Sequence, residues 1–170
     1  SGNGPTMNDG NAFFHSSHNN IGAAAAPSVA QLSAMRAIMR KQKDPAAQRF
    51  IKVTPATFLG PVGMDDDVRV LVNAEYDPED VALQKPNSVR GMVQNILGAP
   101  ELEGDDYYIF GSNGSRRTAP FEIAFVNGQA TPVLEMQEAW SARGVSWRVT
   151  HDFAAGGLDW RNGVKSAGAT

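Results

Sequence analysis

The chain has 170 residues, of which 42% are hydrophobic and 19% are charged, with a formal net charge of −3 and no cysteine. This composition is typical of one globular domain, alone or with an extended arm, and it excludes a chain that is disordered throughout. The weak acidity argues against a protein that gathers nucleic acid by bulk charge, and the lack of cysteine excludes disulfides, thiolate nucleophiles and cysteine zinc sites.

The N-terminal part of the sequence predicts a flexible arm or loop over residues 1–27. Residues 1–12 contain three glycines and one proline but no aliphatic cluster, so little burial would offset the entropy of ordering them. We expect Phe13 and Phe14 to anchor this arm on a surface. The apolar run 21–26 is too short to cross a membrane and lacks the charged flank of a signal peptide, so we expect a soluble protein without a membrane partner.

Two helices are predicted in the first half of the chain. Ser28 and Gln31 have the spacing of a capping box, and the apolar residues that follow recur on one helical face, which predicts a helix from about Ser28 to Lys43. Basic residues in its last turn suit the negative end of the helix dipole, which explains them without a DNA contact. A second helix is expected over residues 64–76, with the aspartates 65–67 stabilising its first turn rather than binding magnesium.

Short strands are predicted between and after these helices. Residues 50–59 are rich in β-branched and aromatic side chains but include Pro55, which indicates a short or edge strand. Residues 92–97 contain four apolar side chains that predict a short buried strand or turn. The aromatic run 107–110 predicts a further strand.

The last third of the sequence is almost entirely strand-like. The runs 121–126 and 131–136 flank Asn127-Gly128, a dipeptide typical of hairpin turns, so they are expected to pair with each other. Along residues 145–153 apolar side chains occupy the odd positions and polar ones the even positions, which predicts a half-buried antiparallel strand. The tail after it predicts one more short strand and a loose end.

No catalytic, cofactor or metal site is predicted. His15 and His18 have a spacing that binds metals when other ligands join them, but ordinary loop histidines are the simpler interpretation. Adjacent strand residues point to opposite faces, so Asp152 is badly placed to orient His151 in a hydrolytic triad. The loop 111–115 lacks the context of a nucleophile elbow and of a phosphate-binding loop, so we expect no enzyme activity.

Five blocks of the sequence, in order, resemble the Mu-type major head subunit of tailed phages. They are DGNAFFHSSHNNIG (9–22), SVAQLSAMRAIMRKQKD (28–44), FIKVTPATFLGPV (50–62), PFEIAFVNGQATPVLEMQE (120–138) and GVSWRVTHDFAAGGLDWRNGVKSAG (144–168). The resemblance covers about residues 9–168, and the two closing blocks are the most specific. Members of this family are sometimes encoded fused behind a prohead protease.

The resemblance implies an α+β protein with the Hong Kong 97-type capsid fold. Residues 28–119 would form most of the axial domain, which packs around capsomer centres, and residues 120–170 would supply strands of the peripheral domain. The family's N-terminal arm, extended loop and spine helix are not recognisable in this sequence. The chain therefore resembles a C-terminal portion of such a subunit, and its apolar strand face around Trp147 is expected to seek a partner.

The implied function is structural: a virion subunit that assembles with copies of itself into pentamers and hexamers in the bacterial host cytoplasm. Further expected partners are scaffold and portal proteins of the same phage and the double-stranded DNA that the head encloses without sequence-specific binding. The alternatives are a prohead maturation protease and a minor head-associated protein. Tryptophan and arginine often anchor interfaces, which selects five candidate contact residues: Trp140, Trp147, Arg148, Trp160 and Arg161.

Overall fold

The computed structural model describes residues 2–46, 48–80, 84–112, 119–138 and 144–169. The chain forms two compact units: unit 1 consists of residues 1–120 and 157–170, and unit 2 of residues 121–156. The predicted division at 28 and 120 differs from this one, because residues 1–27 and the C-terminal segment both belong to unit 1. No helix in the described ranges has the length and apolarity needed to cross a membrane.

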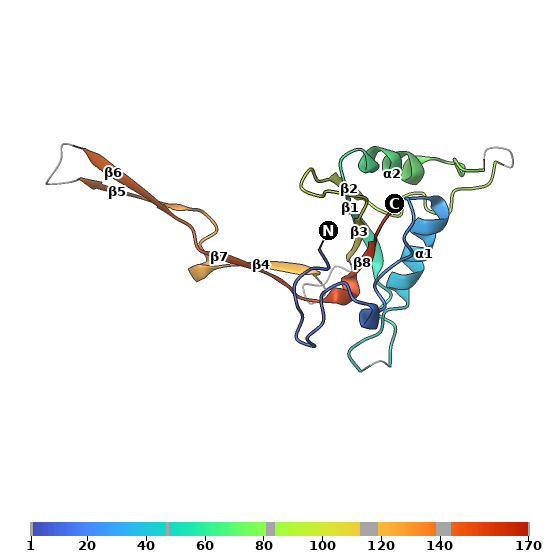
Figure 1. The fold of residues 1–170 in the computed structure, drawn as a ribbon, viewed down its shortest axis with the longest axis horizontal. Helices are drawn as coiled ribbons and strands as arrows, with labels where there is room; N and C mark the ends of the chain where they lie inside the picture. Colours follow the sequence, from blue (N-terminus) through green and yellow to red (C-terminus); the bar gives the residue numbers. More distant parts are fainter. Residues whose placement is uncertain (1, 47, 81–83, 113–118, 139–143, 170) are drawn as a thin grey trace. The chain divides into compact units, whose positions relative to one another are not determined.

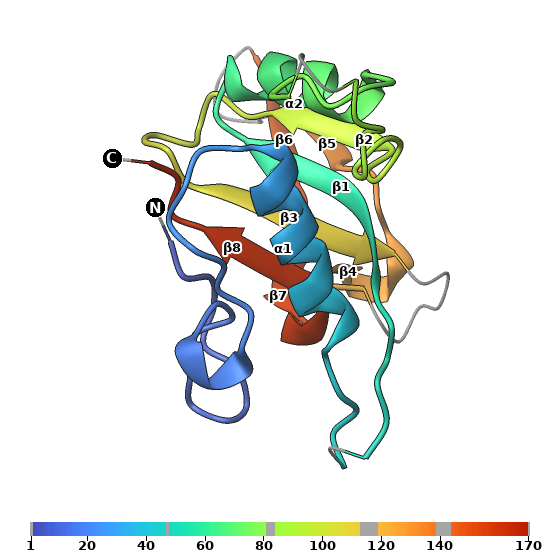
Figure 2. The ribbon, with the colours of Figure 1, turned by 90° about the vertical axis from the view of Figure 1, so that its right-hand side faces the viewer.

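Unit 1 is built around one four-stranded sheet with the strand order β2-β1-β3-β8 (Figures 1 and 2). Its elements are η1 (Ser16–His18), α1 (Val29–Arg40), β1 (Thr54–Gly60), α2 (Met64–Asn73), β2 (Asn95–Gly98), β3 (Tyr107–Ser112), η4 (Trp160–Asn162) and β8 (Gly163–Ser166). β1 pairs in parallel with β2 and antiparallel with β3, which in turn pairs antiparallel with β8. The sheet thus combines neighbours in sequence with a strand from the end of the chain.

β1 lies inside this sheet, so of the two predicted alternatives, a short strand or an edge strand, the edge strand is wrong. The strand tolerates Pro55 because the register with β3 shifts between Pro55 and Thr57. At such a bulge a missing N–H costs the ladder little.

The helix α1 confirms the first predicted helix, although it ends at Arg40 and not at Lys43. The Ser28 hydroxyl accepts the Gln31 backbone N–H at 3.0 Å, as in a capping box. The Gln31 side chain instead donates to the Ala23 carbonyl at 2.6 Å, so only one half of the box forms. This bond ties the segment before the helix to its first turn.

The helix α2 confirms the second predicted helix but ends at Asn73, before the predicted Tyr76. Its C-terminal carbonyls are capped by Asn87, whose side-chain amide donates to Leu71 at 2.6 Å and to Ala74 at 3.0 Å. Residue 74 is already extended. A cap supplied from a distant loop leaves no local signal, which is why the sequence pattern overestimated the helix.

The two faces of the sheet bury different sets of side chains. On one face α1 and α2 cover a hydrophobic core that includes Leu32, Met35, Phe58 and Ile109, all fully buried. On the other face the N-terminal segment brings Phe13 and Phe14 against Tyr108. The anchoring role predicted for the two phenylalanines is confirmed, since both side chains are buried. Their burial offsets part of the entropy lost when the segment is ordered.

Unit 2 is a ribbon of antiparallel strands, with β4 (Phe121–Phe125) paired to β7 (Phe153–Gly157) and β5 (Val133–Glu138) paired to β6 (Val145–Thr150) (Figure 1). The expected hairpin between the runs 121–126 and 131–136 is therefore wrong. Asn127 and Gly128 do adopt positive φ, at 55° and 73°, but within the short 3-10 turn η3 (Val126–Gly128). The two runs follow each other along one arm of the ribbon, and each pairs with the returning chain.

The single strand expected over residues 145–153 is divided into β6 and the start of β7. The interruption falls at residues 151–152, where the Asp152 carbonyl accepts the Val126 N–H at 3.2 Å. This break lies opposite η3, so an irregularity in one arm of the ribbon is matched by one in the other.

Candidate subunit-contact surface

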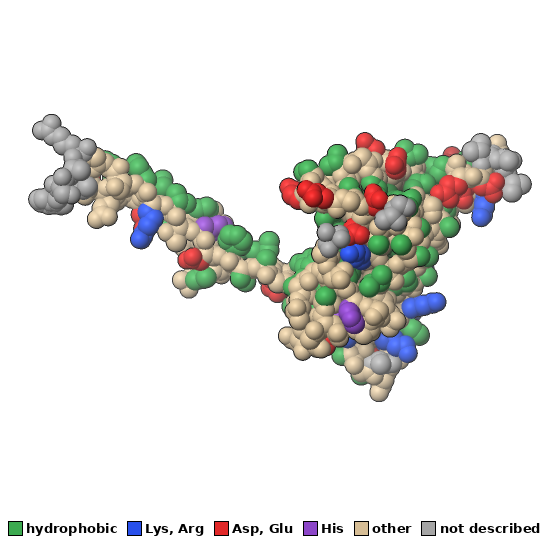
Figure 3. All heavy atoms as spheres, viewed as in Figure 1, with side chains coloured by type: hydrophobic (Ala, Val, Ile, Leu, Met, Phe, Trp, Pro, Cys, Tyr) green, Lys and Arg blue, Asp and Glu red, His purple; other side chains and the backbone are tan. Residues whose placement is uncertain are grey.

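The ribbon of unit 2 carries a row of large apolar side chains on one face of β5 and β6. The register places Met136 opposite Trp147 and Leu134 opposite Val149. Their exposed fractions are 57% and 61% for the first pair and 61% and 65% for the second. We call these four residues, with Val145, the apolar ribbon face; hydrophobic side chains run along the ribbon in Figure 3. Contiguous exposed apolar side chains of this size mark interaction sites in soluble proteins.

The expected alternation of residues 145–153 is thus present, but the expected half-burial is not. The six residues of β6 are all exposed. Within the described residues of unit 2 no second layer covers the apolar ribbon face. Sequence alternation showed which side chains share a face, but it did not show whether that face is covered within the chain.

The opposite face of the same strands is polar and internally paired. Arg148 donates from Nε to the Glu135 carboxylate at 2.7 Å, directly across the two strands. Gln137 lies opposite Ser146. Arg148 therefore has a partner within the ribbon, and an exposed pair of this kind contributes only about 0–1 kcal/mol to stability.

Trp160 and Arg161 lie in unit 1, where they hold the N-terminal segment. The Trp160 ring stacks on His18 with centroids 4.2 Å apart and 6° between the planes, and the Arg161 guanidinium lies 4.2 Å from the Trp160 ring. Arg161 also donates to the Lys43 carbonyl at 2.9 Å and pairs with Asp159 at 3.1 Å. Of the five predicted contact residues, Trp147 and Arg148 share a strand, these two join a separate intramolecular cluster, and Trp140 lies outside the described residues.

The two N-terminal histidines make ordinary hydrogen bonds. The ring nitrogens of His18 face the Asp9 carboxylate at 2.6 Å and the Phe13 carbonyl at 3.1 Å. His15 bonds to the Ser17 hydroxyl at 2.7 Å. Across the described ranges, no group of three or more His, Asp or Glu side chains is placed to hold a metal ion.

The contact between Asp9 and His18 gives a pH-dependent prediction. Hydrogen bonds from His18, and then from Asn11, hold the pKa of Asp9 well below its ordinary value of 3.8. A lowered folded-state pKa stabilises the fold above the unfolded value, and this contribution is lost as the pH falls below 3.8. We expect Asp9→Asn to lower the Tm at neutral pH and to converge with the wild type in acid. Thermal unfolding of both proteins, measured from neutral pH to below pH 3.8, checks this prediction. A Tm difference that does not depend on pH would contradict it.

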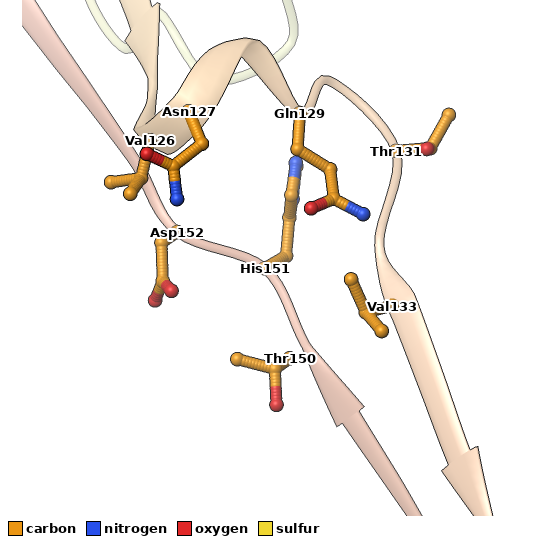
Figure 4. Close-up of a pocket in the computed structure, with 8 residues that line it drawn as sticks. All are labelled: Val126, Asn127, Gln129, Thr131, Val133, Thr150, His151 and Asp152. Atoms are coloured by element: carbon orange, nitrogen blue, oxygen red, sulfur yellow. The ribbon is translucent and has the colours of Figure 1, made fainter.

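A small hollow lies beside His151 in unit 2 (Figure 4). It has a volume of about 80 Å³, far below the roughly 300–1,000 Å³ of typical ligand sites. The His151 ring stacks on Phe125, with centroids 5.7 Å apart, and lies tilted against Phe153, with centroids 5.2 Å apart. In Figure 4 the Asp152 side chain points away from His151, so the two do not form a catalytic pair in this arrangement.

These features, above all the exposed apolar ribbon face, are typical of a structural protein. The chain belongs to the phage capsid protein family, whose sequence model matches residues 1–166. It is accordingly a structural component of the phage head and of the virion.

Comparison with individual proteins adds one solved structure. No curated protein sequence matches the chain. A chain in the structure described as "Satellite phage P4 procapsid including size determination (Sid) protein" is similar, with 11% sequence identity and a TM-score of 0.41. The match covers 88% of this chain and 42% of that one, so this chain spans less than half the length of its structural relative.

Proposed function

We propose that this chain is the C-terminal part of a Mu-type major head subunit with the Hong Kong 97-type fold. In this proposal the subunit assembles with copies of itself into pentamers and hexamers that enclose double-stranded DNA. Unit 1 contributes the axial domain, and the ribbon of unit 2 contributes strands of the peripheral domain. Scaffold and portal proteins of the same phage bind to the shell that these subunits form. Membership of the phage capsid protein family supports a head role, and the uncovered apolar ribbon face is the observation that carries self-association.

The physical reason is the free energy of leaving that face in water. Burying one large apolar side chain is worth about 1.5–3 kcal/mol. The apolar ribbon face carries five such side chains in adjacent positions. A two-stranded ribbon is also marginally stable by itself, so a partner that covers it stabilises the fold and the assembly together.

The backbone of the ribbon offers a second means of contact. In the described part of unit 2, β5 and β6 form a two-stranded sheet, so each strand has one edge outside the pairing. Open strand edges pair readily with strands of other chains. A partner subunit can therefore bind the apolar face and extend the sheet in the same contact.

The test is a pair of matched double variants, in which Met136→Glu/Trp147→Lys alters the apolar face. The control, Gln137→Glu/Ser146→Lys, places the same two charges on the adjacent cross-strand pair of the opposite face. We expect the first variant to weaken self-association by at least about 30-fold, the loss of one interface hot spot, and the control to change it little.

Light scattering during size-exclusion chromatography over a concentration series measures this difference, and electron microscopy identifies shells or capsomers. A wild-type chain that stays monomeric at every concentration would refute self-assembly. Equal losses in both variants would refute the role of the apolar ribbon face.

A further inference from the structure

A second charged surface lies in unit 1, in the segment that joins α1 to β1. Residues 40–52 contain five basic side chains and one acidic side chain, in a chain whose net charge is −3. The five basic residues are all exposed: Arg40, Lys41, Lys43, Arg49 and Lys52. The helix dipole explains cations in the last turn of α1, but it does not extend to Arg49 or Lys52, which follow the helix by several residues.

These cations surround an exposed aromatic ring. Phe50 is 56% exposed, and the Lys43 ammonium lies 5.5 Å from its ring centroid. Arg40, Lys41 and Lys52 line an open groove of about 480 Å³ together with Phe50. We call these five cations, with Phe50 and this groove, the basic end of unit 1.

Among the ion pairs within the described ranges, none includes a cation of residues 40–52. The one acid of the segment, Asp44, accepts the backbone N–H groups of Gln48 and Arg49 at 2.9 and 3.4 Å. Its carboxylate is thus used to shape the loop.

The opposite kind of surface surrounds α2. Asp66, Asp67 and Glu75 are exposed there. Two of these acids form loose ion pairs, since Arg69 lies 4.0 Å from Asp66 and Arg90 lies 3.7 Å from Glu75, and both cations are more than half exposed to solvent. Exposed apolar side chains accompany these acids: Val62 at 67%, Val70 at 63%, Tyr76 at 51% and Leu97 at 53%. We call this surface the acidic end.

The two ends lie at opposite ends of α1, on either side of unit 1 (Figures 2 and 3). α1 has 12 residues and is therefore about 18 Å long. Its first N–H, on Val29, donates to Glu79 at 3.3 Å near the acidic end, while its last turn runs into the basic end. Two complementary surfaces on opposite sides of one body suit a head-to-tail contact, which builds rings when the rotation between copies closes.

We propose that the basic end of one copy binds the acidic end of the next copy in a head-to-tail contact between unit 1 bodies. This inference rests on the proposed self-assembly and names a surface for it that is separate from the apolar ribbon face. Phe50 would lie among the apolar side chains around α2 while the charges pair at the rim. Exposed apolar side chains on both surfaces favour a protein partner over DNA, whose phosphates would match the cations but not Phe50.

A charge exchange tests this contact. One variant, Lys41→Glu/Lys43→Glu/Lys52→Glu, makes both ends acidic; a second, Asp66→Lys/Asp67→Lys/Glu75→Lys, makes both ends basic. All six positions are exposed, and circular dichroism verifies that each variant is folded. We expect each variant alone to associate at least about tenfold more weakly than the wild type, because like charges face each other. An equimolar mixture should recover association, since acidic ends then meet basic ends.

Light scattering at low and high salt distinguishes the outcomes. Recovery in the mixture, weakened near 1 M salt where charges are screened within about 3 Å, supports the contact. Undiminished association of both single variants would overturn it while leaving the proposed function intact, and a monomeric wild type would overturn both. Loss of binding to a double-stranded DNA fragment by the first variant, without any change in its association, would assign the basic end to DNA instead.

Discussion

Replacing Phe13 by alanine is expected to lower the free energy of unfolding of unit 1 by about 3–5 kcal/mol, the range for deleting a buried phenylalanine ring. Phe13 is fully buried and meets Phe14 edge to face with centroids 4.9 Å apart. Urea denaturation followed by circular dichroism measures the loss.

The expected loss lies toward the upper end of this range because three glycines line the site of the Phe13 side chain. A Cβ atom added at Gly4 or Gly163 would lie only 2.7 or 2.8 Å from atoms of Phe13, and one at Gly157 would lie 3.2 Å away. Glycines have no side chain that could move into the vacated space, and a cavity that stays open costs more than one that collapses.

Phe50→Ala is the matched control, because that ring is 56% exposed. It should leave the free energy of unfolding within about 0.5 kcal/mol of the wild type. If Phe13→Ala were as mild as this control, the N-terminal segment would not be part of the folded core in solution.

Replacing Lys165 by methionine is expected to cost about 3–5 kcal/mol, the usual loss when one partner of a buried ion pair is removed. The Lys165 ammonium lies 3.1 Å from the Asp106 carboxylate, and the two side chains are only 10% and 11% exposed. Methionine keeps much of the length of the lysine stem but leaves the buried carboxylate without this cation.

The double variant Lys165→Met/Asp106→Leu separates charge from packing. Removing both charges should recover most of the lost stability, because buried ion pairs replaced by apolar side chains are often neutral or stabilising. Denaturant midpoints of the wild type, both single variants and the double variant form the cycle. A double variant as unstable as Lys165→Met would show that Lys165 acts through other contacts, such as its 3.3 Å bond to Asn3.

Local signals in the sequence located the helices and most strands. The cap at Ser28 and the apolar face that follows it define α1 to within a turn, since both signals lie within the helix itself. The end of α2 was missed because its cap comes from Asn87. Strand pairing was the weakest prediction: Asn127-Gly128 resembles a hairpin turn locally, but the partners of β4 and β5 lie beyond residue 144.

The candidate surface was predicted only in part, because local sequence patterns report some of its properties and not others. Alternation along residues 145–150 identified the face that Trp147 shares, because the two-residue period of a strand is a local property. Whether that face is covered depends on the rest of the assembly, and the expected half-burial was wrong. Trp160 and Arg161 have the same residue types, yet their contacts with His18 and Lys43 join segments that are far apart in the chain and leave no local pattern.

The position of β8 constrains the order in which the chain can fold during synthesis. β3 pairs with a strand that the ribosome delivers only after the whole of unit 2. Until then Tyr107 and Ile109 lie on an open sheet edge, the kind of surface that aggregates. If the strands of the ribbon pair early, residues 120 and 157 come together, and this shortens the loop that must close before β8 can pair with β3. The hydrogen bond from the Leu158 N–H to the Pro120 carbonyl, at 2.9 Å, lies at this junction. Formation of the ribbon would then help unit 1 to complete its sheet before the chain contacts another subunit.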